Sequence, residues 1–270
     1  MLKYIMTSTG KECVNDMEKV LEVKGLSKQY KKGVYASRDV TFDINEGEIF
    51  ALIGPNGAGK TTTIRMIATL LKATEGDAVV AGHSILTEPD KVRECITYLP
   101  DEAGAYKSMS GRKYLQFMAG IFAPDKKIAE EYVKRAEEMC GLGDRLDDKI
   151  GSYSRGMIRK LLLSRAVMSH PKLAILDEPT SGLDIINALE IRRMIKDLAR
   201  QYGMSFLLSS HNMLEIEFVS DRVGIIAGGH LLELGKPEEM KARHGVSNLE
   251  EVFERVVKEN EIHISSEEGA

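Results

Sequence analysis

The sequence predicts an α/β fold in which a mostly parallel sheet is flanked by helices. Short β-rich runs alternate with longer amphipathic segments. Several of these runs are apolar throughout, as is typical of strands buried on both faces of a parallel sheet. With 270 residues, of which 43% are hydrophobic, the chain can form one large domain with a sizeable core. This composition excludes a chain that is disordered as a whole.

The expected strands are short, and most of the apolar ones precede a helical segment. The early strands are separated by charged turns such as Asn-Glu-Gly at 45–47, so we expect an antiparallel β flap there. The expected strands cover 20–24, 40–44, 49–53, 78–81, 96–99, 173–176, 205–208 and 223–226.

A helical subdomain is expected to interrupt this α/β core. Strand signals vanish after Asp101, and the segment 126–141 places apolar residues at helical spacing with charges between them. These side chains are interpreted as packing residues. They are Ile128, Tyr132, Ala136 and Met139.

The predicted organisation has four parts. Residues 1–17 form an N-terminal extension, and 18–100 together with 161–240 form the α/β core with its flap. Residues 101–160 form the helical subdomain, and 241–270 a C-terminal helix with a polar tail.

Charge and cysteine content narrow the class of protein. The 37 basic and 41 acidic residues are mixed along the chain, which argues against nucleic acid as a partner. The three cysteines are far apart and suggest neither zinc nor disulfides, so a reducing, cytosolic setting is expected. No stretch reaches the roughly 18 apolar residues of a membrane helix, so work at a membrane would need another chain to cross it.

A phosphate-binding loop follows the apolar strand at 49–53. The segment fits the pattern G-x-x-x-x-G-K-[ST] between a strand and a helix that is expected to end near Leu71. Its backbone N–H groups and the helix N-terminus suit an anion; Lys60 can reach the β- and γ-phosphates of ATP, and Thr61 can offer a hydroxyl to Mg²⁺. The predicted nucleotide-binding residues of this loop are Gly54, Pro55, Asn56, Gly57, Ala58, Gly59, Lys60, Thr61 and Thr62.

Two acidic residues end the apolar strand at 173–176. Asp177 is expected to hold Mg²⁺, directly or through water, and Glu178 to orient or deprotonate the attacking water. A lone Asp-Glu pair is more often a surface turn or a helix cap, so the interpretation depends on the phosphate loop.

The order of these motifs resembles that of the nucleotide-binding subunit of an ATP-binding cassette (ABC) transporter, from about residue 20 to 253. The segment 152–184, ahead of and through the acidic strand, carries the resemblance most specifically. The family signature is commonly L-S-G-G-Q, and this chain keeps Ser154 and Gly156 but has Arg155 in place of a glycine and Met157 in place of the glutamine.

The resemblance implies that Ser154 and Gly156 bind the γ-phosphate of ATP held by a second copy. Arg155 could add charge at that phosphate or point to solvent. The segment 181–184 is similar to a loop that contacts the opposite subunit, and His211 matches the family's switch histidine at the γ-phosphate.

The resemblance also assigns Tyr30 to stacking on adenine, with Tyr35 as the rival. Asp101 stands where most members have a glutamine that touches magnesium; it is either a metal contact or a loop residue with no catalytic contact. Acidic residues here resemble the sodium and drug exporter branch.

The implied function is a transport-coupled ATPase that forms a head-to-tail dimer with itself or a related subunit. It would act with ATP and Mg²⁺ on the cytoplasmic face of the membrane, peripherally, and drive a separate permease engaged by the helical subdomain and the Asp101 loop. The alternatives are a soluble cassette ATPase of the iron-sulfur assembly type and a non-hydrolysing regulatory module.

Overall fold

The structure, a computed structural model, describes residues 18–31 and 33–267, with side chains described as far as residue 260. Residues 1–17, expected as an N-terminal extension, lie outside the described part. No helix in the described ranges is long and apolar enough to cross a membrane.

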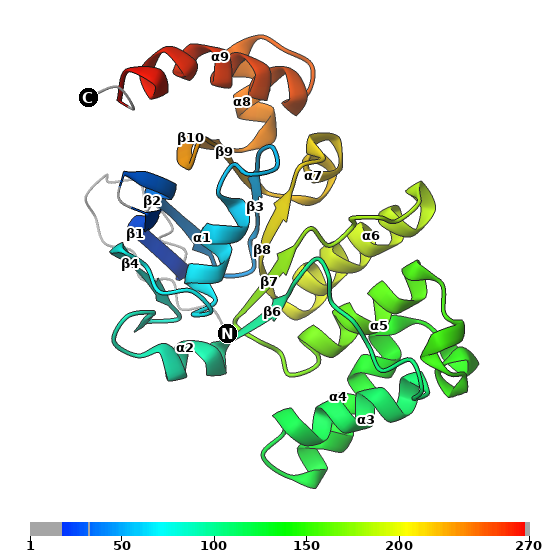
Figure 1. Ribbon diagram of the computed structural model, residues 1–270. Helices are drawn as coiled ribbons and strands as arrows, with labels where there is room; N and C mark the ends of the chain where they lie inside the picture. Colours follow the sequence, from blue (N-terminus) through cyan, green and yellow to red (C-terminus); the bar gives the residue numbers. More distant parts are fainter. Residues whose placement is uncertain (1–17, 32, 268–270) are drawn as a thin grey trace, which may run out of the picture.

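A six-stranded sheet forms the centre of the molecule (Figure 1). Its strand order is β10-β9-β3-β8-β7-β6, and all neighbouring strands are parallel except the pair of β9 and β10. The predicted parallel sheet is confirmed, although β10 at its edge was not foreseen. The strands are β3 (Ile49–Ile53), β6 (Ile96–Leu99), β7 (Leu173–Asp177), β8 (Ser205–Ser210), β9 (Arg222–Ala227) and β10 (His230–Gly235).

Side chains alternate between two apolar cores, one on each face of this sheet. Ala51 of β3 packs into the core beneath the helices, whereas its neighbours Phe50 and Leu52 pack into the core beneath the flap. All five residues of β3 are buried, which is why this strand reads as an unbroken apolar run.

The second sheet is the predicted antiparallel flap, with strand order β2-β1-β4-β5. Phe42 of β2 stacks on Phe50 of β3, with ring centroids 4.9 Å apart, and this contact joins the two sheets. The short strand β5 was not predicted. The flap strands are β1 (Lys19–Lys31), β2 (Val34–Asn45), β4 (Glu75–Val80) and β5 (His83–Ser84), and helices α1 (Lys60–Ile67) and α2 (Pro89–Cys95) lie beside them.

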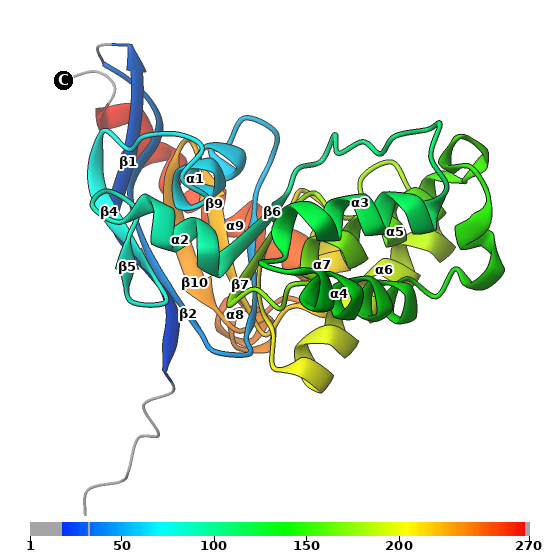
Figure 2. The same ribbon diagram turned by 90° about the horizontal axis from the view of Figure 1, so that it is seen from below.

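The helical subdomain projects from the opposite side to the flap (Figures 1 and 2). Helix α4 has the bounds that the periodicity predicts: Asp125 caps its first turn and Gly141 ends it in the left-handed conformation. The helices of this part are α3 (Gly111–Phe122), α4 (Lys126–Cys140), the short 3₁₀ turns η1 (Gly143–Asp147) and η2 (Ile150–Ser152), and α5 (Arg155–Val167).

Helices α6 and α7 follow β7 and β8, and α8 and α9 close the chain beside the sheet (Figure 1). Leu249, Val252 and Val256 of α9 are buried as its apolar face predicts. Two helix ends differ from expectation: α1 stops at Ile67, before Leu71, and α9 continues to Glu267, into the expected polar tail. The helices are α6 (Ile185–Tyr202), α7 (Met213–Val219), α8 (Pro237–His244) and α9 (Leu249–Glu267).

Candidate functional site

The polar residues singled out in the sequence gather at one edge of the six-stranded sheet. Strands β3, β6, β7 and β8 are parallel, so their carboxyl ends meet there, where α/β proteins usually bind ligands. A pocket of about 250 Å³ opens at this edge. Its lining residues are Ala36, Pro55, Asn56, Gly57, Ala58, Gly59, Lys60, Thr61, Thr62, Asp101, Asp177 and Glu178.

The loop from β3 to α1 curls around the amino group of Lys60. Gly59 has a φ of 106°, and a Cβ there would lie 2.4 Å from the carbonyl oxygen of Ala36, so only glycine fits. Lys60 is 5% exposed and donates to the carbonyls of Gly54 at 2.7 Å and Pro55 at 3.1 Å. Burial lowers the pKa of Lys60, whereas the charge of Glu178 opposes this shift. An anion bound in the loop would supply a further countercharge.

Asp177 ends β7 and is held by hydroxyl groups. The hydroxyls of Thr61 and Ser209 lie 3.3 and 2.5 Å from its Oδ1, and the Tyr98 hydroxyl donates to its Oδ2 at 3.2 Å. The carboxylate is 4% exposed, so these donors satisfy oxygens that water hardly reaches.

The donor set at Asp177 fits Mg²⁺ shared with a phosphate ligand. It offers a carboxylate and the Thr61 hydroxyl, both hard oxygen ligands. Within the described ranges no group of three or more His, Cys, Asp or Glu side chains could form a metal cage. Magnesium is usually bound by one or two carboxylates plus waters and substrate phosphates, so such a cage is not required.

Glu178 lies between a cation and a histidine. Its Oε1 is 3.7 Å from Lys60 Nζ, and its Oε2 is 2.9 Å from His211 Nδ1. The backbone of Glu178 has a φ of 50°, a conformation that is costly for a non-glycine residue and persists only where surrounding contacts hold it. Its N–H donates to the carbonyl and the hydroxyl of Ser209, at 3.2 and 3.0 Å, which holds this conformation in place.

Three residues of the site escaped the sequence analysis: Tyr98, Ser209 and Arg159. Ser209 stands two residues before His211 at the end of the same strand, and this position was an available signal. Tyr98 lies within the strand run of β6, and Arg159 lies within helix α5. Neither the strand pattern nor the helical periodicity indicates that these side chains contact the site. Arg159 lies 3.6 Å from the carboxylate of Asp101.

Comparison with known proteins accounts for this combination of residues. A family model described as "ABC transporter" matches residues 37–181. The chain is 41% identical to the ABC transporter ATP-binding protein YhcH of Bacillus subtilis over 218 residues, which cover 81% of this chain and 70% of the relative. It belongs to the ABC transporter family. As a member, it is an ATP-binding and ATP-hydrolysing subunit.

Other relatives and solved structures agree with this membership. The ABC subunit is 36% identical to the bacitracin transport ATP-binding protein BcrA of Bacillus licheniformis, over 84% of this chain and 73% of BcrA. It is 34% identical to the linearmycin resistance ATP-binding protein LnrL of Bacillus subtilis, over 87% of this chain and 77% of LnrL. A solved ATP-binding subunit of an ABC transporter superposes with a TM-score of 0.76 at 28% identity, covering 88% of this chain and 99% of that one.

The signature residues of this ABC subunit begin α5. Ser154 caps the helix and accepts a hydrogen bond from the Met157 N–H at 3.2 Å. Gly156 faces α6, where a Cβ would lie 1.9 Å from Asn187 Oδ1. Arg155 donates to the Gly182 carbonyl at 3.4 Å, so it contacts the loop 181–184 of its own chain. Ser154 and Gly156 are not among the residues that line the phosphate pocket.

The two tyrosines considered for adenine differ in their contacts. Tyr30 is 59% exposed at the end of β1, with Lys28 Nζ 5.5 Å from the ring centroid. Tyr35 has its hydroxyl 3.4 Å from Glu75 and its ring beneath the Arg38 guanidinium. Neither tyrosine lines the phosphate pocket, and the preference for Tyr30 stays a prediction.

Proposed function

We propose that this ABC subunit hydrolyses ATP at the phosphate pocket with Glu178 as the general base. The observation that carries the proposal is the position of Glu178: its carboxylate lies between Lys60 and His211 and next to the buried carboxylate of Asp177. A carboxylate in this place can accept a proton from a water that attacks the γ-phosphate.

Other residues of the pocket, together with His211 and Tyr30 outside its lining, bind and orient the nucleotide. The loop 54–62 supplies backbone N–H groups, Lys60 neutralises the β- and γ-phosphates, and His211 contacts the γ-phosphate. Thr61 and Asp177 would hold Mg²⁺, which supplies charge neutralisation on the phosphates when bound. Tyr30 stacks on adenine.

The signature is proposed to act on the ATP of a second copy. Ser154 and Gly156 stand outside the subunit's own phosphate pocket, and the N-terminus of α5 presents N–H groups suited to a phosphate. Beside the loop 181–184, Ile185 and Ile186 are 83% and 72% exposed. A head-to-tail dimer would bury these two apolar side chains, which are costly in water.

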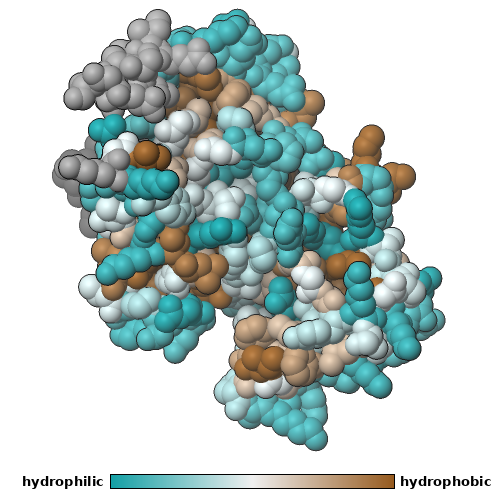
Figure 3. Space-filling model, viewed as in Figure 1, coloured by the Kyte–Doolittle hydropathy of each residue, from teal (hydrophilic) through white to brown (hydrophobic). Residues whose placement is uncertain are grey.

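The partner is proposed to be a membrane permease that docks between the core and the helical subdomain. Figure 3 shows apolar side chains gathered over the end of the α3–α4 hairpin, where Ile121 and Phe122 are exposed, and Leu70 and Leu86 are exposed on the core. A pocket of about 290 Å³ lined by residues of both parts, among them Thr97 and Phe122, would receive a permease helix.

Export is the proposed direction of transport, since BcrA and LnrL carry names that refer to bacitracin transport and linearmycin resistance. The test of the proposed function has two parts. The first measures phosphate release from Mg·ATP by the purified chain and by Lys60→Met. The second asks whether a multi-span subunit co-purifies with the chain from membranes. Turnover that requires Lys60, together with capture of a multi-span subunit, supports the proposal. Turnover by a chain that captures no membrane partner would favour a soluble ATPase of the iron-sulfur assembly type. Absence of turnover would favour a regulatory module.

A further inference from the structure

A buried arginine connects the signature helix to the phosphate pocket of the same subunit. Arg159 of α5 is 8% exposed, and its Nη2 donates to the backbone carbonyl of Asp101 at 3.0 Å. The same nitrogen lies 3.6 Å from Asp101 Oδ1. Asp101 follows β6 and lines the phosphate pocket, so the main chain and the side chain of a pocket residue are both held by α5.

The burial of Arg159 needs this partner. Arginine is almost never fully buried unless it is paired, because taking a guanidinium out of water is costly. Asp101 is the carboxylate within ion-pair distance of Arg159 in the described part of the chain, and the Nη1 of Arg159 has no hydrogen-bond partner there. The Arg159 guanidinium therefore holds α5 to the Asp101 loop, because without Asp101 this buried charge would lack its ion-pair partner.

The Asp101 loop is in turn connected to the carboxylate proposed to hold magnesium. Tyr98 lies three residues before Asp101 and donates to Asp177 Oδ2 at 3.2 Å. Arg159 lies five residues after Ser154, on the same helix. One short path of contacts thus joins the end of α5 that carries Ser154 to the pocket that receives the subunit's own nucleotide.

We propose that Arg159 is a positioning residue that couples nucleotide occupancy of the subunit's own pocket to the placement of Ser154. This inference rests on the proposed function. When ATP orders the Asp101 loop, the ion pair orders the first turns of α5, and Ser154 is presented to the second copy. Removal of the guanidinium leaves nucleotide binding in the loop intact but separates it from α5.

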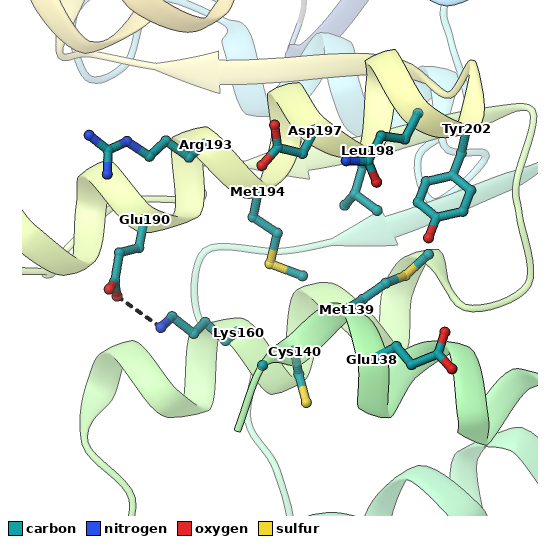
Figure 4. Close-up of a pocket in the computed structure, with 12 residues that line it drawn as sticks. Glu138, Met139, Cys140, Lys160, Glu190, Arg193, Met194, Asp197, Leu198 and Tyr202 are labelled. Carbon is teal, nitrogen blue, oxygen red and sulfur yellow. Dashed lines mark ion pairs between the residues drawn. The ribbon is translucent and has the colours of Figure 1, made fainter. Parts of the chain in front are cut away.

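The neighbouring residue supplies a matched control. Lys160 also projects from α5, but it points to the core helix α6 and pairs with Glu190 at 2.8 Å (Figure 4). Lys160→Met therefore removes a cation and an ion pair from the same helix without touching Asp101. Arg159→Met, Arg159→Lys and Asp101→Asn test the pair itself.

The experiment measures hydrogen exchange of the α5 amides with and without Mg·ATP, at a protein concentration at which sedimentation shows a monomer. We expect ATP to slow exchange over 155–160 by roughly fivefold or more in the unmodified chain and in Lys160→Met, in the range of typical coupling between sites. In Arg159→Met this protection should be lost, and Arg159→Lys should restore part of it. Binding of a fluorescent ATP analogue should stay within about twofold in Arg159→Met, Arg159→Lys and Lys160→Met, because the loop 54–62 is unchanged.

Equal protection in Arg159→Met and in the unmodified chain would overturn the inference while leaving the proposed function intact. Absence of ATP-analogue binding by the unmodified chain would overturn both. If Arg159→Met does not fold, the double variant Arg159→Met/Asp101→Asn removes the unpaired carboxylate as well. ATP protection of α5 in that double variant would contradict the role of the pair. Loss of ATP protection in both Arg159→Lys and Lys160→Met would also contradict it.

Discussion

His211 Nδ1 lies 2.9 Å from Glu178 Oε2, although 33 residues separate the two in the chain. The contact forms because β7 and β8 are parallel neighbours whose carboxyl ends lie side by side. It places an imidazole against the carboxylate proposed as the general base and restricts the orientation of both side chains. Exposure differs between them: the Glu178 side chain is 14% exposed and that of His211 51%.

Glu178→Gln should abolish turnover while ATP binding is kept. The amide cannot accept the proton of the attacking water, and loss of a general base typically lowers the rate by ~10² to 10⁴. Phosphate release under saturating ATP measures the effect, and sedimentation should show an ATP-stabilised dimer. Glu190→Gln, outside the pocket, is the control. Near-normal hydrolysis by Glu178→Gln would contradict the assignment.

Tyr98→Phe should weaken the response to magnesium. The variant removes the hydroxyl that orients Asp177 Oδ2, and loss of such an outer contact typically costs about tenfold or more in metal affinity. The Mg²⁺ concentration that gives half-maximal ATPase activity is the measurement. Tyr153→Phe is the control, because that hydroxyl donates to the Arg145 carbonyl instead. Equal magnesium dependence of both variants would show that the Tyr98 hydroxyl has no such role.

Gly156→Ala should destabilise the chain through a clash with α6. The new methyl would lie 1.9 Å from Asn187 Oδ1, and overpacking of this kind costs about 1 to 3 kcal/mol. Urea unfolding measures the change in free energy. In an Asn187→Ala background the same substitution should cost less, since the obstructing amide is gone. A cost independent of Asn187 would mean that the glycine serves only the backbone at the start of α5.

Glu48 should make stability depend on pH. Burial raises the pKa of Glu48, whose carboxylate accepts hydrogen bonds from the N–H and side chain of Asn45. With a folded pKa above the ordinary value of 4.5, its contribution is fully present below 4.5 and is lost as the pH rises through the folded pKa. The free energy of unfolding relative to Glu48→Gln should therefore fall across that window and then level off. Urea titrations at several pH values from 4 to 7 measure the difference, and a difference that rose with pH would contradict this sign.

The pattern of consecutive residues was sufficient to predict those elements whose structure is determined by residues close together in the sequence. The loop 54–62 and the strand before it are consecutive, so strand, glycine-rich turn and helix start could be predicted together. Helix α4 begins after Asp125 and ends before Gly141, as its caps and periodicity indicate. Periodicity was less informative at the edge strands β5 and β10. The two-residue strand β5 carries no apolar residue and is defined by its pairing with β4. Strand β10 does carry Leu231, Leu232 and Leu234, but it is only half-buried, and its pairing with β9 was not foreseen.

The sequence by itself determined the fold class, the phosphate loop and the acidic end of β7, because each is encoded by adjacent residues with a characteristic spacing. Only the tertiary structure decided which distant groups meet there. Tyr98 and Ser209 reach Asp177, and Arg159 reaches Asp101, because the order of parallel strands and the packing of α5 bring them together. Such contacts depend on the path of the whole chain, which no short stretch of sequence specifies.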